Sequence, residues 1–125
     1  MAAYDIDVQA ERIFKNIRGI AAESLERGLD KAADRLVEGL RACSPVGKGK
    51  RGKRYRDCWS VKRRYRGVRY VGNTKTVPDK KGNKIPLSNI LEYSEGKKAR
   101  PHIRETFDRV EEELADIIKN EVEFE

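Results

Sequence analysis

The chain has 125 residues, which is enough for one domain over residues 1–125 and too short for two ordinary ones. Charged residues make up 39% of it, against roughly 25% in an average soluble domain. No apolar run approaches the ~20 residues of a membrane span, and no apolar block follows Met1 as in a secretory signal, so we expect neither a membrane protein nor a secreted one. The two cysteines are too few for a disulfide scaffold, and we expect both to be reduced thiols in a cytoplasmic product.

The net charge of +7 is unevenly distributed along the chain. Residues 1–42 carry a net charge of −1, residues 43–104 a net charge of +15, and residues 105–125 a net charge of −7. Such segregation favours a partner with an acidic face, or a self-assembly in which one end of the molecule meets the other end of its neighbour.

The first predicted element is a long helix over residues 6–42. It is expected to end before Ser44-Pro45, because the residue that precedes a proline avoids the helical conformation. A basic loop over residues 45–56 follows, and its glycine-rich part has no apolar residue except Tyr55, so it can bury little. The apolar residues of the helix recur at steps of three to five and form one stripe: Ile13, Ile17, Ile20, Leu25, Leu29, Ala32, Leu36 and Leu40.

A β-hairpin is predicted over residues 57–73, because two short alternating runs flank Arg66-Gly67. In the first run we expect Trp59 and Tyr65 to share the core face with Val61. The first run is Trp59, Val61, Arg63 and Tyr65, and the second is Val68, Tyr70 and Gly72.

A loop over residues 74–85 is predicted from its turn-forming residues. A short helix over residues 86–95 and a C-terminal amphipathic helix over residues 101–121 follow, each with a proline suited to its first turn. The elements predict an α+β fold, with a long N-terminal helix, an antiparallel β-sheet with a hairpin, a short helix, and a C-terminal helix packed on the sheet. The apolar stripe of the last helix is Ile103, Phe107, Val110, Leu114, Ile117 and Ile118.

One segment matches a phosphate-binding motif by its letters. Residues 47–52 fit the pattern G-x-G-x-x-G, and with Lys53 they fit the start of a P-loop. Both motifs need a strand before the loop and a helix after it, since the helix N-terminus binds the phosphate. Here a helix precedes and a strand follows, and Arg54 replaces the Ser or Thr that binds magnesium. We therefore reject nucleotide binding and expect no cofactor.

Metal binding and catalysis find little support. Cys43, Cys58 and His102 are the only cysteine and histidine residues, and none is paired at the spacing of a zinc site. A single histidine without G-x-S-x-G does not support a catalytic triad. We expect His102 to lie at the start of the last helix and contact backbone or solvent, and we expect neither a metal site nor an enzyme.

Residues 48–69 contain eleven basic residues and one acidic residue, with aromatic residues between them. Basic side chains neutralise phosphates and aromatic rings stack on bases, so a basic nucleic-acid-binding module is an alternative function. The other interpretation is that the aromatic rings pack the sheet and the charges contact an acidic protein surface. In that interpretation the loop orders when it docks on a partner, through Lys48, Lys50, Arg51, Lys53, Arg54 and Arg56.

Several short segments occur in a definite order. Ser44-Pro45-Val46 and residues 52–59 are similar to a P-V-x-x-G-x-L-R-x-S stretch after a long helix. Residues 71–73 have the sequence V-G-N, residues 87–93 the pattern L-x-x-I-L-E-Y, and residues 100–104 the sequence R-P-H-I-R. In this order, over nearly the whole chain, the sequence resembles the tail-component family of long-tailed bacteriophages, the head–tail joining or tail-completion proteins. The motif residues, with structural roles, are Pro45, Asp57, Trp59, Gly72, Asn73, Leu91, Glu92, Tyr93, Arg100, Pro101, Ile103 and Arg104.

The resemblance implies two packed helices on an antiparallel sheet and a structural role in a ring at the head–tail junction. The implied location is the virion of a phage or prophage, and the host cytoplasm during assembly. The implied partners are further copies of the chain, the neighbouring head-connector and tail-tube proteins, and DNA through non-specific contact. The chain departs from the family pattern in its longer, more basic loop, in Tyr55 where Leu is common, and in residues 94–96, where Gly-Thr is usual. A basic regulator of an acidic host protein is a third interpretation.

Overall fold

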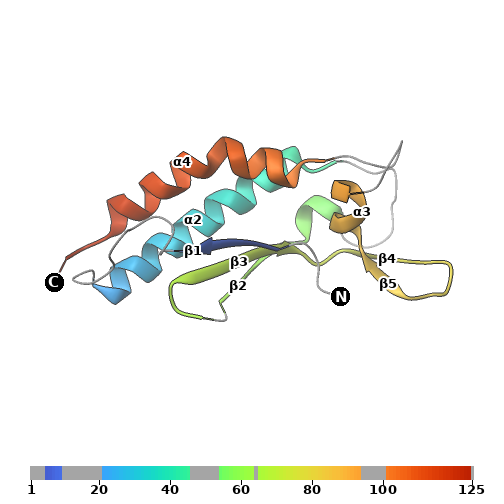
Figure 1. The fold of residues 1–125 in the computed structure, drawn as a ribbon, viewed down its shortest axis with the longest axis horizontal. Coiled ribbons are helices and arrows are strands. Elements are labelled where there is room, and N and C mark those ends of the chain that lie inside the picture. Colours follow the sequence, from blue (N-terminus) through green and yellow to red (C-terminus); the bar gives the residue numbers. More distant parts are fainter. Residues whose placement is uncertain (1–4, 10–20, 46–53, 64, 94–100, 125) are drawn as a thin grey trace.

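The computed structural model describes residues 5–9, 21–45, 54–63, 65–93 and 101–124 (Figure 1). It confirms the α+β fold class, with a long helix, antiparallel sheets, a short helix and a C-terminal helix. The elements in chain order are β1 (Asp5–Gln9), α2 (Ala22–Cys43), a 3-10 turn (Tyr55–Asp57), β2 (Trp59–Lys62), β3 (Val68–Asn73), β4 (Thr76–Pro78), β5 (Lys84–Pro86), α3 (Leu87–Tyr93) and α4 (Ile103–Glu121).

The main sheet has three antiparallel strands in the order β1-β3-β2. The predicted hairpin is confirmed, because β2 pairs with β3 and Val61 lies opposite Val71. Gly67 in the turn between them has a φ of +77°, a backbone conformation that favours glycine. Ile6 of β1 also lies opposite Val71, so the central strand joins both edges of the sheet.

The predicted start of the first helix is wrong, because Asp5–Gln9 form a strand. Ile6 and Val8 are both buried and lie two residues apart, as a period of two requires. The sequence D-I-D-V-Q has this alternation, but five residues are too few to distinguish it from the edge of a helical stripe. Ile13, Ile17 and Ile20 lie outside the described residues. The predicted end of the helix is confirmed, since α2 ends at Cys43.

α2 lies against one face of the three-stranded sheet, and α4 packs alongside α2 (Figure 1). Gly28 of α2 marks a close approach, because a Cβ atom added there would lie 3.1 Å from the Cα atom of Ile118. In the predicted α4 stripe, Phe107 and Ile117 are only partly buried. The buried apolar core consists of Ile6, Val8, Leu25, Leu29, Ala32, Ala33, Leu36, Leu40, Tyr55, Trp59, Val71, Ile103, Val110, Leu114 and Ile118.

The prediction about the core face of the hairpin is wrong for Tyr65. Tyr65 lies beyond the end of β2 and is 65% exposed, so it does not share the core face with Trp59. In β3 the buried alternating set includes Arg69 and Asn73, whereas Tyr70 is half-buried. A pattern based on apolar residues assigns such polar side chains to the solvent face, although hydrogen bonds allow them to be buried.

The loop predicted over residues 74–85 contains a second hairpin, in which β4 pairs with β5. Each strand has three residues, which is too short for a clear alternating pattern. Pro86 is the last residue of β5 and directly precedes α3, rather than lying in the helix. The turn residues that predicted a loop therefore form the turn of a hairpin, which we call the β4–β5 ribbon.

The close approach at Gly28 generates a stability prediction. Ala is favoured over Gly in a helix by about 1 kcal/mol. At Gly28 the added methyl group meets the backbone of Ile118, and overpacking of this kind costs roughly 1–3 kcal/mol. We expect Gly28→Ala to lower the free energy of unfolding in urea by about 1 kcal/mol.

Gly39→Ala is the matched control within the same helix. The nearest atoms to a Cβ at Gly39 belong to the side chains of Thr106 and Arg35, which can move. We expect this variant to be neutral or more stable than the parent protein. Equal stabilisation by both substitutions would mean that α2 and α4 do not approach each other closely at Gly28.

Candidate functional site

The two segments that carry most of the family resemblance meet in the structure. The Glu92 carboxylate at the end of α3 accepts hydrogen bonds from the backbone N–H groups of His102 (2.9 Å), Ile103 (3.0 Å) and Arg104 (3.1 Å). The first N–H groups of a helix have no partner within the helix, and the positive end of the helix dipole attracts an anion. Glu92 therefore caps α4 from another element.

The burial of Glu92 makes this cap sensitive to charge. Its side chain is only 6% exposed, and burial on its own raises the pKa of a carboxyl group. The three backbone hydrogen bonds outweigh the burial and hold the pKa of Glu92 below its usual value. The carboxylate is thus ionised at neutral pH, in the form that accepts all three bonds.

His102 lies at the start of α4, as predicted, but its side chain is buried between Glu92 and the aromatic core and does not lie in solvent. It is 4% exposed, and its Nε2 atom lies 2.8 Å from the hydroxyl oxygen of Tyr55. Its ring packs edge-to-face against Tyr55 and Trp59, with centroid distances of 5.4 Å and 6.2 Å. Burial, with a contribution from Glu92, raises the pKa of the Tyr55 hydroxyl, which therefore stays protonated at neutral pH.

Two further hydrogen-bonded residues connect this cluster to α2 and the sheet. Trp59 donates its indole N–H to the Ser44 hydroxyl at 2.8 Å, and Ser44 donates to the carbonyl of Leu40 at 2.5 Å. Asn73 donates its side-chain amide to the carbonyl of Tyr55 at 2.7 Å. We call this cluster the central joint; it consists of Ser44, Tyr55, Trp59, Asn73, Glu92 and His102.

The remaining motif residues surround the central joint or lie on the surface. Arg104 pairs with Asp108 one turn along α4, and Asp57 pairs with Arg41 of α2. Arg100 lies outside the described residues. Gly72 and Ile103 are buried, Pro45 and Leu91 are partly buried, and Tyr93 and Pro101 are exposed.

The predicted docking loop falls mostly outside the described residues, which leave out Lys48, Lys50, Arg51 and Lys53. Arg54 and Arg56, at its end, are exposed. Between them Tyr55 turns inward to the central joint, and Trp59 is buried as well. Neither ring is therefore available to stack on a base.

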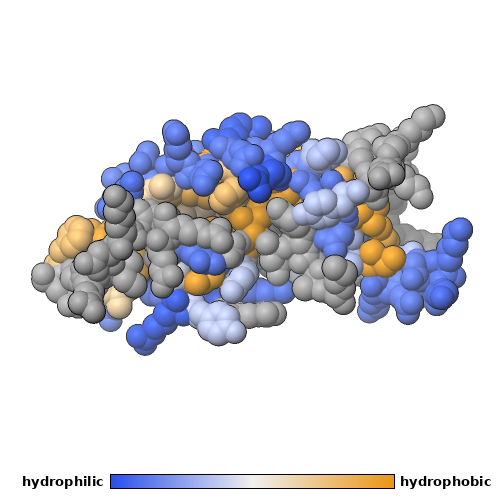
Figure 2. All heavy atoms as spheres, viewed as in Figure 1, coloured by the Kyte–Doolittle hydropathy of each residue, from blue (hydrophilic) through white to orange (hydrophobic). Residues whose placement is uncertain are grey.

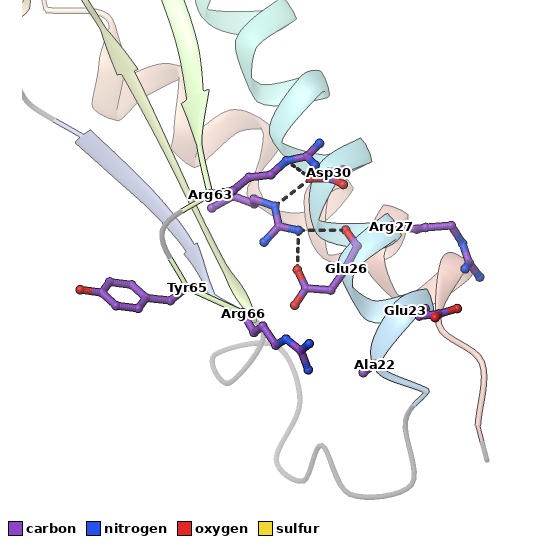
Figure 3. A pocket seen from close by; sticks show the side chains of 9 residues that line it. Ala22, Glu23, Glu26, Arg27, Asp30, Arg63, Tyr65 and Arg66 are labelled. Carbon is purple, nitrogen blue, oxygen red and sulfur yellow. Dashed lines mark hydrogen bonds and ion pairs between the residues drawn. The ribbon is translucent and has the colours of Figure 1, made fainter.

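Arg69, counted among the free basic residues from the sequence, is buried and paired. Its guanidinium group donates to Asp30 at 2.7 Å and to the carboxylate of Glu26 (Figure 3). Burial lowers the pKa of Arg69, but the bonds to Asp30 and Glu26 outweigh it and raise this pKa overall. Glu26 also accepts the backbone N–H of Gly67 at 2.8 Å, so α2 holds both the strand and its turn. The four-residue spacing of Glu26 and Asp30 on one helix face is the sequence signal for such a pair of acceptors.

An open groove of about 650 Å³ lies beside this network, between the start of α2 and the β2–β3 turn (Figure 3). Arg63 pairs with Asp30 there at 3.1 Å, so acids of the groove neutralise part of its basic lining. Tyr65 points away from the ion pairs in this view. The lining residues are Ala22, Glu23, Glu26, Arg27, Asp30, Arg63, Tyr65, Arg66 and Arg69.

Within the described residues, no three His, Cys, Asp or Glu side chains gather in a way that could hold a metal ion. Cys43 and Cys58 are free thiols. Among the helices that the structure describes, none has the length and hydrophobicity needed to cross a bilayer.

Comparisons with known proteins identify no relative. No protein-family model, curated protein or solved structure matches this chain.

The cap on α4 predicts a pH-dependent contribution to stability. Because the pKa of Glu92 is lowered on folding, its stabilisation is present above the unfolded value of about 4.3 and is lost as the pH falls through the folded value. We expect Glu92→Gln to lower the free energy of unfolding by about 1–3 kcal/mol at neutral pH. This difference from the parent protein should shrink below about pH 4.

Glu105→Gln is the control, because Glu105 lies exposed in the first turn of the same helix. We expect its effect to stay within about 0.5 kcal/mol in the same urea titrations. Equal effects of both variants, or a Glu92→Gln effect that does not change with pH, would contradict the cap.

The buried ion pairs of Arg69 generate a second stability prediction. Arg69→Met leaves Glu26 and Asp30 without their shared partner, which should cost about 3 kcal/mol. Arg66→Met, an exposed change in the adjacent turn, should alter stability by no more than about 0.5 kcal/mol. Thermal unfolding in parallel measures both; similar melting temperatures for the two variants would show that Arg69 does not hold the sheet to α2.

Proposed function

We propose that this protein is a structural component of the head–tail junction of a bacteriophage or prophage, acting in tail completion or as part of the neck. The observation that carries the proposal is the central joint. The L-x-x-I-L-E-Y and R-P-H-I-R segments, on which the family resemblance mainly depends, are joined by the three hydrogen bonds of Glu92. The order of these two segments thus has a physical reason, because the Glu92 carboxylate can accept the three hydrogen bonds only if α4 begins just after Pro101.

The kind of residue in this pattern supports an assembly role. Glu92, Trp59 and Asn73 use their polar atoms to hold one element against another. Because these motif residues stabilise the fold of the chain itself, its contacts with partners have to come from other residues on its surface. We propose that it assembles with copies of itself and with the neighbouring head-connector and tail-tube proteins, and that the basic loop ending at Arg54 and Arg56 docks on an acidic protein surface.

The alternative function, a basic nucleic-acid-binding module, has less support. It relied on aromatic rings between basic residues, and of these Tyr55 and Trp59 are buried and only Tyr65 is fully exposed, while Arg69 is neutralised by acids. The exposed Arg54, Arg56, Lys62 and Arg66 still provide for non-specific contact with DNA.

The proposal is tested by deleting the gene from the phage or prophage that encodes it and examining the induced lysate by electron microscopy. We expect DNA-filled heads and finished tails that are separate, and joined particles when the gene is supplied from a plasmid. Intact, infectious particles in the deletion strain would contradict the proposal and would favour the nucleic-acid alternative.

A further inference from the structure

The β4–β5 ribbon ends in an ordered turn. The Asp79 carboxylate accepts the backbone N–H groups of Lys81 and Asn83, both at 2.8 Å. The backbone N–H of Asp79 also donates to the carbonyl of Asn83 at 2.8 Å, and Gly82 completes the turn with a φ of +83°. The ribbon therefore holds its tip in one conformation before any partner binds.

The surface of this turn is strongly basic. Lys80, Lys81 and Lys84 are exposed, and they form no ion pair with the part of the chain that the structure describes. We call these three residues the lysine tip. Residues 75–86 hold four lysines and one acid, Asp79, which gives the ribbon a net charge of +3.

No acid of the neighbouring helix offsets this charge. The only acid of α3 is Glu92, whose buried carboxylate already accepts the N–H groups at the start of α4. The ribbon projects beyond α3 at one end of the molecule (Figure 1). In Figure 2 the residues at this end of the ribbon are hydrophilic. The lysine tip is thus open to an anionic partner.

The edges of the ribbon are poorly suited to pairing with a further strand. β4 ends at Pro78 and β5 ends at Pro86. The backbone bonds from Asp79 to Asn83 and from Leu87 to Lys75 point inward, so the alternation of an antiparallel pair turns the backbone of both prolines outward. Proline has no N–H to donate, and at a strand edge it prevents further pairing. Partners therefore contact the ribbon through its side chains.

These side chains fit phosphate better than they fit a protein surface. Tight protein–protein contacts depend on Trp, Tyr and Arg anchors, and lysine is depleted in them. Residues 78–84 have the sequence P-D-K-K-G-N-K, which contains no aromatic, aliphatic or Arg side chain. A lysine ammonium group, by contrast, binds phosphate as a point charge and releases the counterions of a nucleic acid.

We propose that the lysine tip binds the phosphate backbone of duplex DNA, with the β4–β5 ribbon at the major groove. The major groove is wide enough to admit a two-stranded ribbon. A single strand binds through rings on which its bases stack, and the tip has none. Because lysine contacts to phosphate do not read bases, this binding does not depend on DNA sequence.

The lysine tip is a different surface from the one that the sequence indicated for nucleic acid. That surface was residues 48–69, in which Tyr55 and Trp59 are buried. The lysine tip lies outside this stretch, in residues predicted only as a loop. The inference goes beyond the proposed function and does not depend on it, since the tip binds DNA as a property of the single chain.

Fluorescence anisotropy of a labelled duplex tests the proposal, with the purified full chain and the variant Lys80→Gln/Lys81→Gln/Lys84→Gln. Each phosphate contact that is lost lowers the slope of log affinity against log salt by about 0.9, so we expect the slope of the variant to be smaller by about 2–3. At about 0.05 M salt the variant should bind about tenfold more weakly or worse.

The matched control is Lys31→Gln/Arg109→Gln/Lys119→Gln, which removes the same charge from exposed positions on α2 and α4. Its salt slope should stay within about 1 of the slope of the parent protein. Thermal unfolding of both variants checks that the fold is retained. The exposed ribbon tip contributes nothing to the core, so the lysine-tip variant should melt as the parent protein does.

Four results would overturn the proposal. The parent protein does not bind the duplex at low salt; the two variants weaken binding equally; or the single strand of the same sequence binds more tightly than the duplex. The fourth is displacement of the duplex by poly-glutamate at an equal concentration of charge, which would indicate an acidic protein as the partner instead.

The two proposals fail separately. Unchanged DNA binding by the lysine-tip variant, together with separate heads and tails in the gene-deletion lysate, would remove the DNA contact and leave the function. Binding that depends on the lysine tip, together with intact particles in that lysate, would leave the DNA contact and remove the function.

Discussion

The carboxylate of Glu92 is the contact on which the arrangement of the helices depends. It lies almost entirely out of solvent and satisfies three N–H groups at the start of α4. A buried carboxylate is tolerated only when its oxygens have such partners, so α3 and the start of α4 are fixed relative to each other. The ring of His102 is hydrogen-bonded to the Tyr55 hydroxyl, and the carbonyl of Tyr55 accepts a hydrogen bond from Asn73 of the hairpin, so the hairpin is tied to the same point. The short helix, which buries little apolar surface, thereby sets where the long terminal helix begins.

The helices α2 and α4 were predicted correctly from their long apolar periodicity, and the β2–β3 hairpin from the alternating runs that flank Arg66-Gly67. Over α2 and α4 the repeated pattern outweighs local ambiguity, whereas β1, β4 and β5 have three to five residues each and were missed. Of the central joint, only Trp59, Asn73 and Glu92 were predicted, as motif residues with structural roles. Their contacts could not be derived, because Glu92 and His102 are brought together by the fold and not by a local pattern. The buried Arg69 was assigned to the surface for a similar reason, since its two acceptors lie on a distant helix.

The distribution of charge in space follows from these internal contacts. Acids at the ends of α2 and α4 are compensated by nearby arginines and lysines, and Arg69 is compensated inside. Hydrophilic residues lie along the outer side of α4 and on the β4–β5 ribbon (Figure 2). A fold that neutralises its internal charges is suited to contacts between molecules through the charges left on its surface. The proposed role at a head–tail junction requires contacts of this kind.

Amide hydrogen exchange of the native protein can show whether Glu92 fixes the start of α4. The N–H groups of His102, Ile103 and Arg104 lie at the start of a helix. Amide hydrogens there ordinarily exchange fast with solvent, because they have no hydrogen-bond acceptor within the helix. We expect these three amides to be protected in the parent protein and to lose protection in Glu92→Gln, while the amides in the middle of α4 remain protected. Exchange of the three amides in the parent protein at the rate of an unstructured peptide would contradict it.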